Sequence, residues 1–270
     1  MNEATLFTGT FAVYIIAAFF YFSFLFSKKE SMANLGYKIA FLGLITHTAA
    51  LAWRLFVSGH APFTNMYESL SFLAWASILA YVIIEGMFKI KKAGPYFMLI
   101  VLGLMALASS PLMPKDAAPL MPALQSYWLW LHVSVTMIGE AFFAIAFVTS
   151  IMYLFADSKQ KKGIKTGLSA EKLDEVSYKC IAIGFPLFTL GGMVFGMIWA
   201  YKAWGTYWSW DPKEVWSLIT WFVFALYLHT RLVMGWKGRR SSFIAILGFL
   251  AALFTYFGVN YLLSGLHSYG

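Results

Sequence analysis

Charged residues are scarce in this sequence, and their scarcity excludes an ordinary soluble domain. Of the 270 residues, 12% are charged and 60% are hydrophobic, and the mean hydropathy is +0.70. Soluble globular domains carry about 25% charged residues, so this chain lacks the polar groups needed to cover a surface in water. We therefore expect an integral membrane protein in contact with lipid.

Cysteine is nearly absent as well. The single residue, Cys180, excludes a disulfide framework, a CxxC redox pair and a cysteine-ligated metal site. The segment Met1–Thr8 has no Lys or Arg, unlike the start of a cleaved signal peptide, so we interpret the first apolar run as a retained span. The net charge of +8 is not taken to indicate nucleic-acid binding, because membrane proteins concentrate Lys and Arg in cytoplasmic loops.

Long apolar runs recur along the chain. A spanning helix needs about 20 largely apolar residues. Such runs lie at residues 6–26, 38–57, 69–88, 95–112, 128–155, 178–199, 214–235 and 242–264. The fourth is short and is followed by a Pro-rich stretch that cannot continue a helix, and the polar stretch Asp157–Lys179 is expected to be a loop. The sequence thus predicts an all-α integral membrane protein of about eight transmembrane helices, forming a single membrane domain over residues 1–270.

Positive charge is concentrated on one side of this predicted topology. The connections after the first, third, fifth and seventh runs contain Lys28, Lys29, Lys89, Lys91, Lys92, Lys159, Lys161, Lys162, Lys165, Lys237, Arg239 and Arg240. The opposite side has Arg54, Lys115, Lys202 and Lys213. The positive-inside rule therefore predicts that both termini, and the connection after the sixth run, lie on the external side. It leaves open whether the membrane is a bacterial inner or plasma membrane or a thylakoid.

The most informative stretch is the connection at residues 199–216, which reads WAYKAWGTYWSWDPKEVW. An interfacial aromatic belt is one reading, but a belt distributes Trp and Tyr over all helix ends rather than crowding one connection. The clustering favours an external loop that binds a large planar ligand, because rings stack on ring faces and indole N–H groups can donate to carboxylates. Its aromatic candidates are Trp199, Trp204, Tyr207, Trp208, Trp210 and Trp216. The next helix is expected to start with Asp211 as its cap, Pro212 in first position and Glu214 closing a capping box.

Two motifs together resemble the CcsA (ResC-type) cytochrome c synthesis proteins. The segment Trp204–Trp216, continued by Ser217–Trp221 and Tyr227–Arg231, is similar to the WWD domain of that family, and Ser58–Ser69 is similar to the segment after an early helix. The resemblance covers essentially the whole chain. Heme-handling proteins of the CcmC and CcmF kind share a WWD loop, but the residues Trp210–Glu214 and the helix count favour CcsA.

The histidines are the candidate iron ligands, because neutral imidazole is the usual axial ligand of heme and ionisable groups are costly inside a bilayer. The topology brings His132 and His267 to the level of the loop, and the resemblance implies that they ligate an external heme. His229 lies about 22 Å from Glu214 along the seventh helix, and the resemblance implies that it ligates heme within the membrane. For His47 a structural hydrogen bond is favoured over a role as an intramembrane ligand, whereas His60 is expected to contact either a propionate or solvent.

Polar residues near the loop complete the predicted site. Lys202 and Lys213 flank the loop and are expected either to hold heme propionates or to contact lipid headgroups. Asp211 is counted with the heme-binding residues of the loop as well as being the helix cap.

The resemblance implies a heme-binding and heme-translocating subunit of a cytochrome c synthase of the heme lyase type. Heme b is expected to bind first near His229 and then to be presented on the loop to the CxxCH motif of apocytochrome c. No side chain of this chain is expected to act as a nucleophile, because the attacking groups are the thiolates of the substrate. The implied partners are a CcsB-type membrane subunit, apocytochrome c, a thioredoxin-like thiol reductant and membrane lipid, with no nucleic acid.

Two other functions remain open. A heme transporter that hands heme to a chaperone without bond formation would use the same loop. A bis-His b-type electron-transfer cytochrome would pair histidines inside the helix bundle, and it leaves the aromatic loop unexplained.

Overall fold

A computed structural model describes residues 3–113, 115–116, 120–164, 167–263 and 265. It divides into two compact units, Met1–Leu120 and Met121–Gly270. In the described part of the chain, eight helical stretches are long and apolar enough to cross a membrane, and no strand occurs there. The prediction of an all-α multi-pass membrane protein with about eight spans is confirmed.

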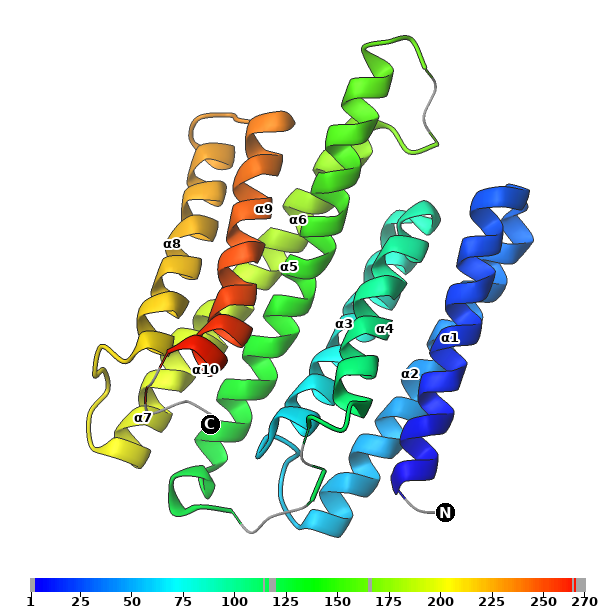
Figure 1. Ribbon diagram of the computed structural model, residues 1–270. Coiled ribbons are helices and arrows are strands. Elements are labelled where there is room, and N and C mark those ends of the chain that lie inside the picture. Colours follow the sequence, from blue (N-terminus) through cyan, green and yellow to red (C-terminus); the bar gives the residue numbers. More distant parts are fainter. Residues whose placement is uncertain (1–2, 114, 117–119, 165–166, 264, 266–270) are drawn as a thin grey trace. The chain divides into compact units, whose positions relative to one another are not determined.

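The first unit is built from α1 (Glu3–Ser27), α2 (Glu30–Ser58), α3 (Met66–Phe88), the short 3₁₀ turn η1 (Lys91–Ala93) and α4 (Gly94–Ser109). Its helices run from blue to green in Figure 1. Buried tyrosines fill its interior: the Tyr14 ring occupies the space that a side chain at Gly43 would need. The glycine therefore lets α1 and α2 approach closely.

The second unit begins with a short 3₁₀ turn, η2 (Pro122–Leu124), and α5 (Tyr127–Gln160). A continuous helical stretch follows, composed of α6 (Ala170–Phe188), the π-helical segment η3 (Thr189–Phe195) and α7 (Gly196–Trp204). After α8 (Pro212–Leu232), a second such stretch comprises α9 (Arg239–Leu253), the π-helical η4 (Phe254–Gly258) and α10 (Val259–Leu262). Helix α5 packs closely on α6 where Gly139 faces Gly184, since a Cβ at Gly184 would lie 2.8 Å from the Gly139 carbonyl oxygen.

Two expectations about connections need correction. The stretch Asp157–Lys179 is not one long loop, because α5 continues to Gln160 and α6 already starts at Ala170. Ser169 caps α6 by accepting a hydrogen bond from the Lys172 amide, a local signal that the polar composition concealed. Between Trp199 and Trp216, only residues 205–211 lie outside helices, because α7 and α8 extend into the aromatic stretch from both sides.

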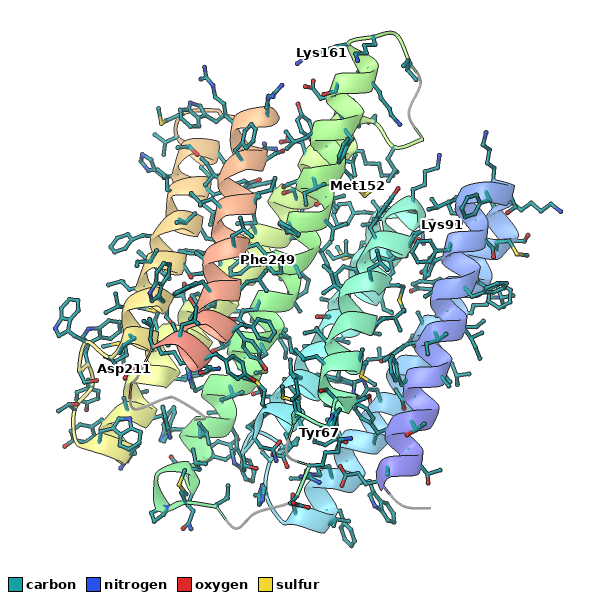
Figure 2. The ribbon with its side chains drawn as sticks, viewed as in Figure 1. Tyr67, Lys91, Met152, Lys161, Asp211 and Phe249 are labelled. Atoms are coloured by element: carbon teal, nitrogen blue, oxygen red, sulfur yellow. The ribbon has the colours of Figure 1, made fainter. Side chains whose placement is uncertain are left out.

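In each unit, the connections at one end carry most of the basic residues. Figure 2 shows Lys91 and Tyr67 at opposite ends of the first unit, and Lys161 and Asp211 at opposite ends of the second. The loop after α7 is thus at the end of its unit away from Lys161.

Candidate functional site

His132, in the second turn of α5, is held by the backbone of the π-helical segment η3. Its Nδ1 donates to the Gly191 carbonyl oxygen at 2.8 Å, an acceptor that also receives the Gly196 amide in the i to i+5 pattern of a π-helix. A carbonyl oxygen can only accept, so this bond places the ring proton on Nδ1 and the lone pair on Nε2. That tautomer is the one in which a histidine ligates a metal through Nε2 with an oriented outer partner.

The surroundings of the His132 ring are close-packed. The Trp199 ring lies parallel to it, at a centroid distance of 5.8 Å and an interplanar angle of 5°. A Cβ at Gly196 would lie 3.0 Å from both Nδ1 and Cε1, so glycine is needed for the ring to occupy this place. π-helical turns are rare and often occur at functional sites. The π-helical segment η3, the glycines Gly191 and Gly196 and the oriented ring of His132 together therefore indicate a candidate ligand site.

The aromatic residues continue from His132 to the loop. Trp199 is buried and meets the Trp204 ring edge-on at 5.9 Å. The indole Nε1 of Trp204 is buried and has no hydrogen-bond partner among the described residues. Buried indole N–H groups usually have a partner, so this donor is suited to an acidic oxygen of a ligand.

The loop itself presents rings in more than one orientation. Tyr207 stacks on Tyr201 at 4.5 Å, whereas Trp208 and Trp210 are perpendicular at 5.8 Å. Trp210 is 70% exposed. Aromatic pairs adopt both stacked and edge-to-face geometries. Since this loop contains one pair of each kind, its rings do not form one flat surface.

The backbone of the loop is fixed by Glu214. Trp210 has a φ of +60°, a conformation that is strained for a bulky residue. Glu214 Oε2 accepts hydrogen bonds from the amides of Ser209 and Asp211 at 2.8 and 3.2 Å, on either side of Trp210. Asp211 caps α8 and Pro212 occupies its first turn, so the predicted capping box is confirmed, and it holds the strained Trp210 in place.

The other predicted site residues of the second unit that the structure describes lie on α7 and α8. Trp216 is half-buried and packs on Phe254 at a centroid distance of 4.2 Å. The Lys213 ammonium donates to Asn260 Oδ1 at 3.0 Å, whereas Lys202 is exposed on α7. His229 is exposed near the far end of α8, and the structure does not bring it to the loop. His267 lies outside the described residues.

The two histidines of the first unit are buried. Both ring nitrogens of His47 have partners, with Nδ1 3.2 Å from Tyr14 Oη and Nε2 3.0 Å from Ser71 Oγ. This arrangement agrees with a structural role for His47. His60 is 6% exposed, and its Nδ1 lies 3.1 Å from the Ala61 carbonyl oxygen.

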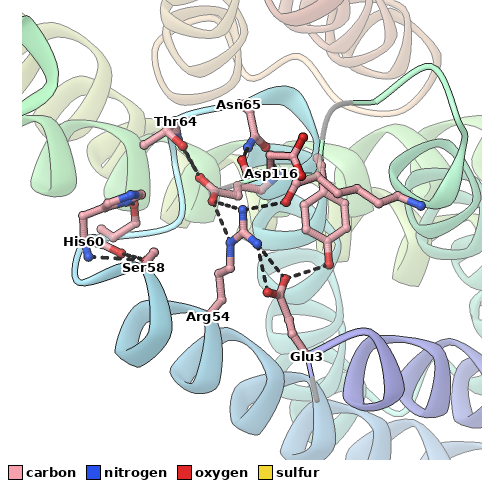
Figure 3. A network of polar contacts seen from close by, with 11 residues as sticks. Glu3, Arg54, Ser58, His60, Thr64, Asn65 and Asp116 are labelled. Atoms are coloured by element: carbon pink, nitrogen blue, oxygen red, sulfur yellow. Dashed lines mark hydrogen bonds and ion pairs between the residues drawn. The ribbon is translucent and has the colours of Figure 1, made fainter. Parts of the chain in front are cut away.

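The sequence did not reveal a buried charge network in the first unit (Figure 3). Arg54 donates to Glu68 at 2.8 Å and to Glu3 at 2.8 and 3.1 Å, and its third nitrogen reaches the Lys115 carbonyl oxygen at 3.0 Å. Glu68 also accepts from the Thr64 amide and hydroxyl groups. The topology predicted Arg54 to be one of the external cations, but its guanidinium is already engaged by two carboxylates. The only signal in the sequence was the presence of charged residues beside apolar runs.

Comparisons with known proteins agree with these features. The family described as Cytochrome C assembly protein matches residues 63–267. Cytochrome c biogenesis protein CcsA of Guillardia theta is 39% identical over 97% of this chain and 94% of its own length, and that of Gloeobacter violaceus is 34% identical over 96% and 93%. The solved structure of cytochrome c heme lyase CcmF matches 98% of this chain with a TM-score of 0.74 at 16% identity. The chain spans 48% of that structure, and the likeness concerns the fold.

Proposed function

The chain belongs to the CcsA proteins of the cytochrome c assembly family and acts in cytochrome c biogenesis; on that premise we propose that it binds heme, moves it across the membrane and presents it for attachment to apocytochrome c. The observation that carries this proposal is His132, which has an oriented tautomer and lies beside the aromatic cluster of residues 199–210. The π-helical segment supplies the carbonyl oxygen that orients this ring, and Gly196 leaves room for it.

At the external site, His132 is the first axial ligand and His267 the second. Trp204, whose buried Nε1 has no partner in the described structure, donates to a carboxylate of the heme. Tyr207, Trp208 and Trp210 cover the porphyrin with ring surface. These residues bind and orient heme b; they do not attack it.

The reaction is an addition that needs no oxidant. Each cysteine thiol of the CxxCH motif adds across one vinyl group of the heme, forming a carbon–sulfur bond while the thiol proton ends on the neighbouring carbon. The chain contributes by holding heme in one orientation toward the incoming peptide, because fixed orientation is itself a large part of catalysis. In this account the chain is the heme-handling subunit of a cytochrome c synthase rather than the provider of a nucleophile.

His229 is the intramembrane ligand at which heme first binds. Its exposure on α8 leaves the imidazole accessible to a neighbouring membrane protein, and bis-His ligation requires a second histidine from elsewhere. We assign that ligand to a CcsB-type subunit, which also binds the apocytochrome, while a thioredoxin-like protein reduces the acceptor thiols. The loop and both termini face the external side of a plasma, inner or thylakoid membrane, opposite the basic connections.

The proposal is tested by maturation in a host that lacks its own cytochrome c assembly system. We expect coexpression of this chain, the partner subunit and an apocytochrome to give an acceptor that retains heme on a denaturing gel. His132→Ala should abolish that heme stain. A heme-loaded chain that never yields covalent heme on the acceptor would instead indicate a transporter that passes heme to a chaperone.

A further inference from the structure

The C-terminal helical stretch docks along the first turns of α8. Phe254 packs on Trp216, and the hydroxyl groups of Thr255 and Thr220 are 3.2 Å apart. Beyond α10, a Cβ at Gly265 would lie 2.5 Å from Asp211 Oδ2. The chain therefore still rests on the start of α8 two residues before His267.

Lys213 lies within this docking surface, at a position that is electrostatically unfavourable for a lysine. It is in the first turn of α8, at the positive end of the helix dipole, where a cation is disfavoured. Its ammonium group donates to Asn260 Oδ1 at 3.0 Å, which joins α8 to α10. It also interacts electrostatically with Glu140 of α5 and with Asp211.

The amide of Asn260 is oriented by a second bond. Asn260 is 5% exposed, and its Nδ2 donates to the Tyr256 carbonyl oxygen at 2.6 Å, within η4. Because that carbonyl can only accept and the ammonium can only donate, the amide has one orientation that satisfies both. The orientation of the amide therefore directs Oδ1 of Asn260 toward the ammonium group of Lys213.

Glu140 connects the same lysine to the helix of the first ligand. It lies eight residues after His132 on α5, about 12 Å farther along the helix axis. Lys213 therefore interacts with the helix that carries His132 and with the helix that leads to His267.

We propose that Lys213, through its hydrogen bond to Asn260, is a positioning residue that fixes the C-terminal segment on the start of α8 and thereby sets the place of the second iron ligand. This inference rests on the proposed function for its heme part. It reassigns Lys213 from holding a propionate to holding the protein segment that precedes the ligand.

The experiment uses the full chain purified with its partner subunit, and compares Lys213→Met, Lys213→Arg and Asn260→Leu with Lys237→Met, an exposed lysine in the connection after α8, as the control. Heme content per protein and the absorption spectrum are measured before and after adding imidazole. We expect Lys213→Met and Asn260→Leu to keep most of their heme but to lose the part of the low-spin bis-His spectrum that comes from the external heme, which imidazole restores. Lys213→Arg and Lys237→Met should retain the wild-type spectrum. Loss of heme, with unchanged ligation of the heme that stays bound, would overturn the proposal, because Lys213 would then hold heme itself. An unchanged spectrum in both Lys213→Met and Asn260→Leu would also overturn it.

Hydrogen exchange in the heme-free chain separates this inference from the heme assignment. Amides of Val259–Leu262 should exchange about tenfold faster in Lys213→Met and in Asn260→Leu, because a hydrogen bond to a charged group is removed, while those of His132–Glu140 stay unchanged. Asn260→Leu keeps the experiment decisive if Lys213→Met does not fold. If the wild type bound no heme, the proposed function would fail, whereas unchanged exchange of Val259–Leu262 would overturn the docking role alone.

Discussion

Replacing Gly196 with alanine tests whether the backbone around His132 positions the ring as a ligand. The new Cβ would lie 3.0 Å from Nδ1 and Cε1 of His132, so the ring must move away by a few tenths of an ångström. That movement weakens the 2.8 Å bond from Nδ1 to the Gly191 carbonyl oxygen. Outer partners of this kind are worth about 10- to 100-fold in metal affinity, which corresponds to roughly 1.4 to 2.7 kcal/mol.

The assay is a heme titration of the heme-free protein in detergent, followed through the Soret band. Gly192→Ala is the matched control, because it lies in the adjoining π-helical segment η3 and its Cβ would meet the Phe188 ring at 3.6 Å, an ordinary contact. We expect Gly196→Ala to bind heme about 10- to 100-fold more weakly and Gly192→Ala to bind as the wild type does. Wild-type affinity in Gly196→Ala would refute the reasoning, and equal losses in the two variants would show that any added methyl group in this stretch disrupts heme binding without a specific effect on His132.

Three further predictions concern the charge network, the loop and the partner. Arg54→Met should lower the free energy of unfolding by about 3 to 5 kcal/mol, because it leaves the Glu68 side chain, 0% exposed, without its cation. A change of less than about 0.5 kcal/mol in the free energy of unfolding, measured in detergent, would contradict this. Trp208→Ala should lower heme occupancy through loss of about 1 kcal/mol of ring contact, whereas Trp53→Ala should not; equal losses would point to folding instead. The chain without a CcsB-type subunit should give no covalent heme on an apocytochrome, and a heme stain from the chain alone would exclude the two-subunit account.

Features set by local sequence were predictable. The apolar runs gave the helical spans, because a bilayer requires a minimum length of apolar helix. Asp211, Pro212 and Glu214 predicted the start of α8, since a capping box depends on residues within one turn. Sidedness of charge is equally a property of the connections themselves.

Features that depend on contacts between distant residues were not predictable. The bond between His132 and the Gly191 carbonyl oxygen joins residues 59 positions apart, and it depends on a π-helical turn that hydropathy does not register. The partner of Lys213 is Asn260, 47 positions away, and Arg54 reaches Glu3 across 51 positions. Residue type indicated that these groups needed partners, but only the packing of the helices selects which ones.

The spectrum of purified His132→Ala tests the central claim most directly. The wild-type chain with its partner subunit should show a low-spin, six-coordinate heme. His132→Ala should lose the contribution of the external heme to that signature and keep that of the intramembrane heme at His229, and added imidazole should restore the lost part by occupying the position of the missing side chain. A His132→Ala protein with wild-type heme content and the full wild-type low-spin spectrum in the absence of imidazole would contradict the assignment of His132 as an axial ligand.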